Sequence, residues 1–268
     1  MTDLKVLLAL AHEALDLARP HLLERPTEAS AKTKRDMVTD IDFAVESELR
    51  SFLRDRVPHV GFLGEEEGGV EEDAEFVWAL DPVDGTANMV HGLPLVAVSL
   101  GLIQRDTQVL GAIDLPFLGH RYGAVAGQGA GSHSGPISVR SNHDLAEAIV
   151  SIGDYAVGLG SAQRNQGRIV LTAALADRVQ RVRMFGSAAI DLVWVAEGKL
   201  DACVMLSNKP WDTVAGVAIA REAGATVLDI DGTSHTSNSR ATIAAAPGIS
   251  GELLELVQRA VAGSVEVA

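Results

Sequence analysis

Residues 81–86 read Asp-Pro-Val-Asp-Gly-Thr, and this stretch decides which fold we expect. Asp81 and Asp84 follow an apolar run that is typical of a buried strand. Pro82 fixes the backbone between the two carboxylates, and Gly85 permits a positive φ angle. Carboxylates at the end of a buried strand are unfavourable unless a cation neutralises them. The stretch therefore predicts a cation site, and an ordinary Asp-Pro…Asp-Gly turn is the alternative.

Two more acidic segments could reach the same strand end. Glu65, Glu66 and Glu67 follow an apolar run, with a solvated loop as the alternative role. Asp212 follows Trp211 before an apolar helix, where its simplest role is an N-cap. Mg²⁺ prefers oxygen ligands, and two such ions can clamp a phosphoryl group. Together the segments favour a metal-dependent phosphatase.

The composition restricts the possible partners. The 268 residues carry a net charge of −14, and 47% of them are hydrophobic, which is enough for a large core. This charge argues against nucleic acid as a partner, because its phosphates need clustered lysine and arginine. Bound cations would reverse the local field for an anionic substrate. We therefore expect a small phosphorylated substrate.

Cysteine usage and the N-terminus predict a cytoplasmic protein. Cys203 is the only cysteine, which excludes an internal disulfide and favours a reducing compartment. Charged residues interrupt residues 1–20, and the apolar ones recur at helical spacing, so we expect a helix rather than a secretory signal. No run is long and apolar enough to cross a membrane, so no membrane partner is expected.

The hydrophobic pattern predicts a layered α/β fold whose rhythm changes near residue 145. We expect two subdomains in one compact unit, 1–145 with most of the candidate ligands and 146–268 with Asp212. Residues 127–131 indicate a hairpin turn rather than a phosphate-binding loop. The expected strands are 60–63, 76–80, 95–103, 109–115, 148–152, 179–184, 200–205, 226–230 and 242–246. The expected helices are 3–24, 43–56, 167–176, 187–196, 213–223 and 250–261.

Several motifs, in this order, resemble the inositol monophosphatase family of Mg²⁺-dependent, lithium-sensitive phosphatases. The resemblance spans about residues 32–230 and implies a five-layered αβαβα sugar-phosphatase fold, usually a homodimer, with two or three Mg²⁺ ions. The motifs are VTDID at 38–42, GEE at 64–66, DPVDGTAN at 81–88, GQGA at 127–130, RMFGSAA at 183–189 and WDTVAGVAIAREAGATV at 211–227.

The resemblance also implies roles for particular residues. Glu65 would help to activate the attacking water, and Thr86, supported by Asp42, would orient or deprotonate it. Asp84 would help to stabilise the leaving alkoxide. The implied metal ligands are Glu65, Asp81, the Val83 carbonyl, Asp84 and Asp212. The implied substrate contacts are Asp84, Gly85, Thr86, Gly186, Ser187, Ala188 and Asp212.

The chain departs from the family pattern near the expected substrate. Met205 lies seven residues before Asp212, where members acting on inositol phosphate often carry an acidic residue. A thioether cannot accept a strong hydrogen bond from a ring hydroxyl. Lys209 adds a positive charge there, or is a solvated loop residue. The motif GEE is extended to GEEE, which leaves the choice between Glu65 and Glu66 open.

The leading hypothesis is hydrolysis of inositol 1-phosphate to inositol and phosphate by metal-activated water. Because of Met205, histidinol phosphate, fructose 1,6-bisphosphate and a 3′-phosphoadenosine nucleotide are alternative substrates for the same chemistry. A non-catalytic regulatory or binding protein on the same fold is an alternative of another class.

Overall fold

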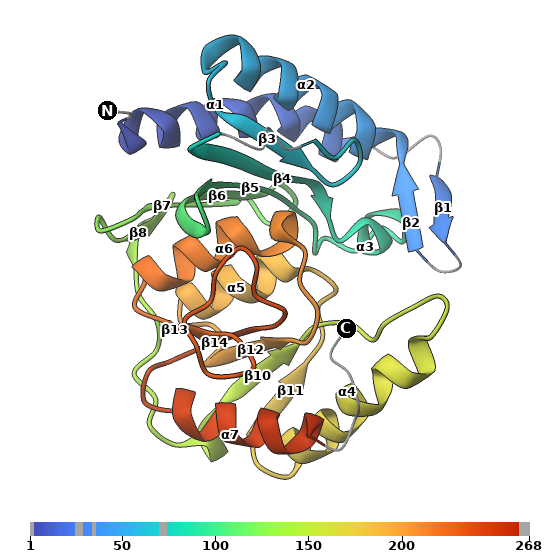
Figure 1. Ribbon diagram of the computed structural model, residues 1–268, viewed down its shortest axis with the longest axis vertical. Helices are drawn as coiled ribbons and strands as arrows, with labels where there is room; N and C mark the ends of the chain where they lie inside the picture. The colour runs from blue at the N-terminus through green and yellow to red at the C-terminus, as the bar shows by residue number, and fades with distance from the viewer. Residues whose placement is uncertain (1–2, 25–28, 34–35, 70–73, 263–268) are drawn as a thin grey trace.

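The computed structural model describes residues 3–24, 29–33, 36–69 and 74–262, and these contain a seven-stranded and a five-stranded sheet (Figure 1). A separate antiparallel hairpin pairs β1 (Ala29–Thr33) with β2 (Asp36–Thr39). In spatial order, the first sheet contains β3 (Gly61–Gly64), β4 (Phe76–Asp84), β5 (Ala97–Gln104), β6 (Thr107–Leu115), β7 (His120–Val125), β8 (Ala130–Ser132) and β9 (Gly135–Ile137). The second contains β11 (Arg181–Arg183), β10 (Ile149–Ile152), β12 (Ala202–Met205), β14 (Thr242–Ala245) and β13 (Thr226–Leu228).

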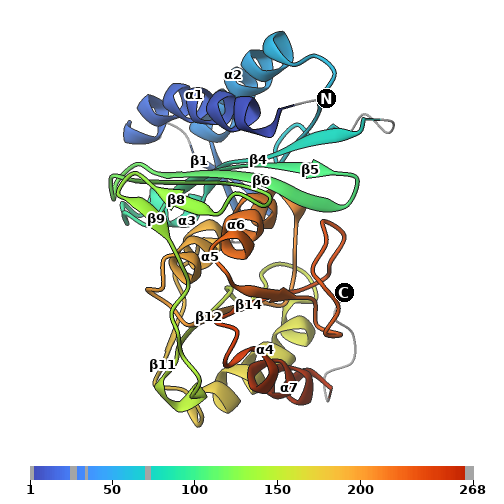
Figure 2. The same ribbon diagram turned by 90° about the vertical axis from the view of Figure 1, so that its left-hand side faces the viewer.

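Helices alternate with these sheets and complete five layers (Figure 2). The outer face of the first sheet packs on α1 (Leu4–Leu23) and α2 (Asp40–Arg56). Between the sheets lie α5 (Ala188–Ala196) and α6 (Pro210–Glu222). The outer face of the second sheet packs on α4 (Ser161–Ala176) and α7 (Ser250–Val261). The five-layered prediction is therefore confirmed. No helix of the described residues could span a membrane.

Three helices begin earlier than the sequence pattern predicts. Helix α2 begins at Asp40 because Thr39 and Asp42 form a capping box, with the Thr39 N–H donating to Asp42 Oδ2 over 2.8 Å. Helix α6 has Lys209 as its N-cap, so the N-cap role expected of Asp212 is wrong and this residue lies in the first turn. Helix α4 begins six residues early, and the hairpin β1–β2 is absent from the predicted elements.

The hairpin turn predicted at residues 127–131 is confirmed between β7 and β8. The carboxylate of Glu222, at the end of α6, accepts the N–H groups of Gly127, Gln128 and Gly129 over 2.7–3.0 Å. These N–H groups therefore bind a side chain of the protein itself, which removes the phosphate-loop alternative.

Helix α6 lies directly on the first sheet because glycines remove the side chains between them. A Cβ atom at Gly111 would overlap with the Ala215 carbonyl, and one at Gly101 would overlap with Val214. This close approach fixes the N-terminal half of α6 relative to β5 and β6.

Gly111→Ala should lower the free energy of unfolding by about 3 kcal/mol, because overpacked backbone has no room to relax. Urea denaturation measures this loss. The matched control is Gly251→Ala in α7, where a Cβ meets nothing within 4 Å. That variant should keep or gain about 0.5 kcal/mol. Equal effects of the two substitutions would contradict the close packing.

Candidate active site

Strand β4 carries Asp81 and Asp84 on one face of the sheet because it contains a β-bulge. Asp81 pairs with Ser99 of β5 and Asp84 pairs with Ala97, so two residues of β4 oppose one of β5. In a regular strand, side chains three positions apart point to opposite faces, and the extra residue brings them to the same one. Pro82 lies within the bulge, where a missing N–H is tolerated. The stretch is thus a bulged strand rather than the turn considered above.

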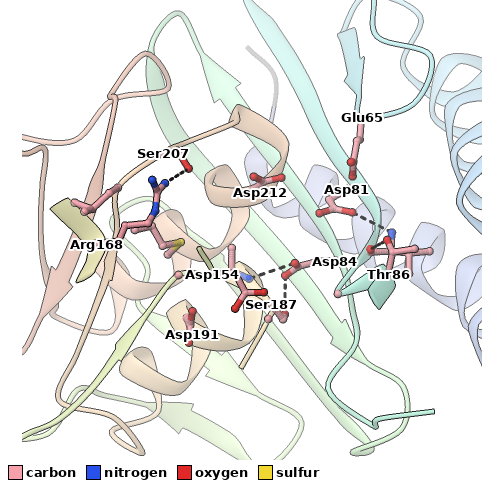
Figure 3. Close-up of a pocket in the computed structure, with 17 residues that line it drawn as sticks. Glu65, Asp81, Asp84, Thr86, Asp154, Arg168, Ser187, Asp191, Ser207 and Asp212 are labelled. Carbon is pink, nitrogen blue, oxygen red and sulfur yellow. Dashed lines mark hydrogen bonds between the residues drawn. The ribbon is translucent and has the colours of Figure 1, made fainter. Parts of the chain in front are cut away.

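Carboxylates from three segments converge at this end of β4 (Figure 3). One carboxylate oxygen each from Glu65, Asp81 and Asp212 lies within 4.8 Å of the other two. Asp81 is 3% exposed, and no basic side chain of the described residues forms an ion pair with it. Burial, Glu65 and the neighbouring aspartates raise the pKa of Asp81 well above its usual value. This donor set fits a hard divalent cation bound through oxygen.

The loop that carries Glu65 is held by a buried carboxylate of α2. Glu46 is fully buried and accepts the N–H groups of Glu66 (2.8 Å) and Glu67 (3.0 Å). Arg50 donates to the same carboxylate over 2.6 Å. Within the acidic triplet, Glu65 is therefore the member that joins the converging group, while its two neighbours are bound to Glu46 through their backbone.

Asp84 points at the N-terminus of α5. Its carboxylate accepts the Ser187 hydroxyl (2.7 Å) and the N–H groups of Ala188 (3.2 Å) and Ala189 (2.6 Å). Burial raises the pKa of Asp84 to about 6, although these hydrogen bonds oppose the shift. Asp84 lines the same cavity as the converging group without being one of its three members. Ser187 and Ala188, expected on the substrate side, also position this carboxylate.

Thr86 links the strand end to α2. Its hydroxyl lies 2.9 Å from the Val83 carbonyl oxygen and 3.2 Å from Asp42 Oδ1, so two acceptors compete for one proton. The other oxygen of Asp42 binds Thr39. Gly85 has a φ of +94°, and a Cβ there would press on the Leu95 carbonyl. The expected contact between Asp42 and Thr86 is therefore present, although Asp42 does not line the cavity.

The cavity beyond these residues has a volume of about 280 Å³. Gly186 and Met205 line it, as the motifs suggest, whereas Lys209 is exposed and is not among its lining residues, which fits the solvated alternative. Four polar residues that the motifs do not single out also line it: Asp154, Arg168, Asp191 and Ser207 (Figure 3).

Two of these four residues carry a signal in the sequence. Asp154 and Ser207 come just after β10 and β12, which are neighbouring parallel strands, and ligands often bind beyond the carboxyl ends of such strands. Asp191 lies in α5, where burial raises its pKa well above the usual value. Arg168 lies in α4, and nothing in its spacing separates it from a solvated helix residue.

Glu46→Gln should weaken the apparent affinity for a divalent cation about 10-fold, because a neutral amide holds the Glu65 loop less firmly. Titration calorimetry with Mg²⁺ measures this. Gly64→Ala should do the same, since a Cβ there would overlap with the Glu46 carboxylate. Glu48→Gln on the exposed side of α2 is the matched control and should leave the affinity unchanged. Equal affinities in all variants would contradict the positioning role.

Comparison with known proteins agrees with this geometry. A sequence model of the inositol monophosphatase family matches residues 2–264. Inositol-1-monophosphatase ImpA of Mycolicibacterium smegmatis is 35% identical over 95% of this chain and 93% of its own. A protein of Thermotoga maritima named fructose-1,6-bisphosphatase/inositol-1-monophosphatase is 31% identical over 85% of this chain and 84% of its own.

A solved structure extends the likeness to three dimensions. The inositol monophosphatase of Anabaena superposes with a TM-score of 0.86 at 31% identity and covers 96% of this chain and 97% of its own. Family, relatives and fold agree along nearly the whole length, and the acidic group can hold a divalent metal. The chain belongs to the inositol monophosphatase family and is a phosphatase that acts on small phosphorylated substrates.

Proposed function

We propose that the protein hydrolyses inositol 1-phosphate to inositol and phosphate with Mg²⁺. The observation that carries this proposal is the convergence of Glu65, Asp81 and Asp212 at one end of a cavity. The Val83 carbonyl and Asp84 would complete the ligands for two or three ions. The name of the M. smegmatis relative supports inositol 1-phosphate as the substrate. We also propose a cytoplasmic homodimer.

The residues of the chain would bind and orient the reactants. When bound, the ions would lower the pKa of a water molecule and stabilise negative charge on the phosphoryl group. The Thr86 hydroxyl, held by Asp42, would orient this water, and Glu65 would help to take its proton. Asp84, fixed by α5, would lie toward the leaving oxygen, which takes a proton from water. Gly85 and Gly186 would line the two sides of the bound ester.

Fructose 1,6-bisphosphate is a second candidate substrate. The name of the T. maritima relative includes this activity. Arg168 also places a positive charge in the cavity, and Met205 replaces an acidic contact to a ring hydroxyl. A second phosphate group would therefore have Arg168 as a partner, whereas a ring hydroxyl would lack the acidic acceptor that Met205 replaces.

Asp81→Asn and Asp212→Asn should each lower kcat by at least about 10²-fold, because each removes a charge that organises the transition state. Phosphate release from inositol 1-phosphate, fructose 1,6-bisphosphate, histidinol phosphate and 3′-phosphoadenosine 5′-phosphate measures this, with Mg²⁺ and with EDTA. Asp55→Asn, an exposed carboxylate of α2, is the matched control. Mg²⁺-independent release, or near-normal rates in both variants, would refute the proposed site.

Metal-free protein should lose stability as pH rises from 3.8 to about 6. Asp84 has a pKa near 6 when folded and an ordinary value of 3.8, so the folded state binds more protons between these values. Mg²⁺ at about 100 times its Kd should raise Tm by about 5 °C at neutral pH. Calorimetry of the wild type and Asp84→Asn measures both effects. An identical pH slope in the two proteins would contradict the assignment to Asp84.

A further inference from the structure

Arg168 is a buried cation that forms no ion pair with a carboxylate of the described residues. Its residue exposure is 8%, and it lines the cavity from α4. Its guanidinium donates to the Arg164 carbonyl and to the Ser207 hydroxyl, both over 3.0 Å. Among the described residues, no carboxylate forms an ion pair with it, although Asp154 and Asp191 line the same cavity. Burying a charge without a counter-ion is unfavourable, so an anion from outside would stabilise this arrangement.

Ser207 gives this cation a neighbouring donor. Because the Ser207 oxygen accepts from Arg168, its own proton remains available for another acceptor. Ser207 is exposed and follows β12, beside the buried Met205. A guanidinium next to a hydroxyl donor matches the oxygens of a phosphate or a carboxylate. Arg168 and Ser207 therefore present hydrogen-bond donors to an anion, whereas the thioether of Met205 cannot accept a strong hydrogen bond from a hydroxyl group.

The two ends of the cavity have opposite character. Glu65, Asp81 and Asp212 form the acidic end, and Arg168 and Ser207 lie together on the wall formed by α4 and the end of β12 (Figure 3). Metal ions at the acidic end would bind the phosphate that is hydrolysed. The cationic wall is then left for another part of the same substrate.

We infer that Arg168, together with Ser207, binds a second anionic group of the substrate. This inference rests on the Mg²⁺-dependent hydrolysis proposed above, but it makes the preferred substrates small phosphate monoesters that carry a second phosphate or a carboxylate. Inositol 1-phosphate would be hydrolysed, but with a lower kcat/KM than a doubly anionic ester. Arg168 thereby determines specificity without touching the phosphorus under attack.

If Arg168 had a purely structural role, its substitution would have a different effect on the substrates. The guanidinium joins α4 to the segment after β12, so its loss could loosen this wall for every substrate alike. An anion-binding role affects doubly anionic substrates selectively, and mainly through KM. The ratio of kcat/KM between substrate classes therefore separates the two roles.

The experiment measures kcat/KM with Mg²⁺ for fructose 1,6-bisphosphate, 6-phosphogluconate and inositol 1-phosphate. The first two distinguish a second phosphate from a carboxylate as the preferred group. In Arg168→Gln, the ratio of the better doubly anionic ester to inositol 1-phosphate should fall about 10–100-fold, as expected for lost hydrogen bonds to a charged group. Arg168→Lys should restore part of the ratio. Arg164→Gln, which removes an exposed cation of the same helix, should leave it within about twofold.

Three outcomes would overturn the inference. These are a wild-type protein that favours inositol 1-phosphate over both doubly anionic esters, a ratio unchanged in Arg168→Gln, and an equal fall for all substrates. If Arg168→Gln does not fold, two other measurements test the inference. These are the preference of the wild-type protein among the three esters and the ratio of kcat/KM values in Ser207→Ala. Absence of Mg²⁺-dependent release from every ester would instead refute the proposed function, so the two failures are distinguishable.

Discussion

Repulsion among buried carboxylates is the constraint on which the rest of this structure depends. Asp81 is nearly inaccessible, and Glu65, Asp84 and Asp212 all act to raise its pKa. Carboxylates that are buried close together are unfavourable unless protons or metal ions neutralise them. A divalent cation bound by these carboxylates would relieve this repulsion. Under the proposed function, stability and catalysis would therefore depend on one set of oxygens.

A different feature of the backbone holds each of these carboxylates in place against the repulsion. The bulge in β4 turns Asp84 to the face that carries Asp81, and the N–H groups at the start of α5 then hold it. The buried carboxylate of Glu46 accepts the backbone N–H groups of Glu66 and Glu67, which holds the loop that carries the partly buried Glu65. Glycines bring α6, and with it Asp212, down onto the sheet. Rigid positioning of this kind reduces the reorganisation that ligand binding requires.

The layered fold and the identity of the acidic residues could be predicted from the sequence, because apolar periodicity and motif order are local signals. The bulge could not, since a proline and a glycine beside Asp84 predict a turn equally well. The early start of α6 before Asp212 does have a local signal, because Pro210 lies at its first position, where proline is favoured. Arg168 could not be found either: its burial results from contact between α4 and the segment carrying Ser207, 39 residues away. Long-range contacts have no local signature.

The substitution at Met205 and the buried charge of Arg168 have a common physical explanation. An acidic residue at position 205 would accept a hydrogen bond from a ring hydroxyl, and it would also add a negative charge to the cavity that Arg168 lines. With a thioether there, the cation keeps its full charge and faces a cavity that already contains Asp154 and Asp191. Those two carboxylates form no ion pair with it among the described residues. If Arg168 binds an anionic group as inferred above, recognition at this wall would depend on charge rather than on hydroxyl groups, while the carboxylates at the other end of the cavity still fit a divalent cation.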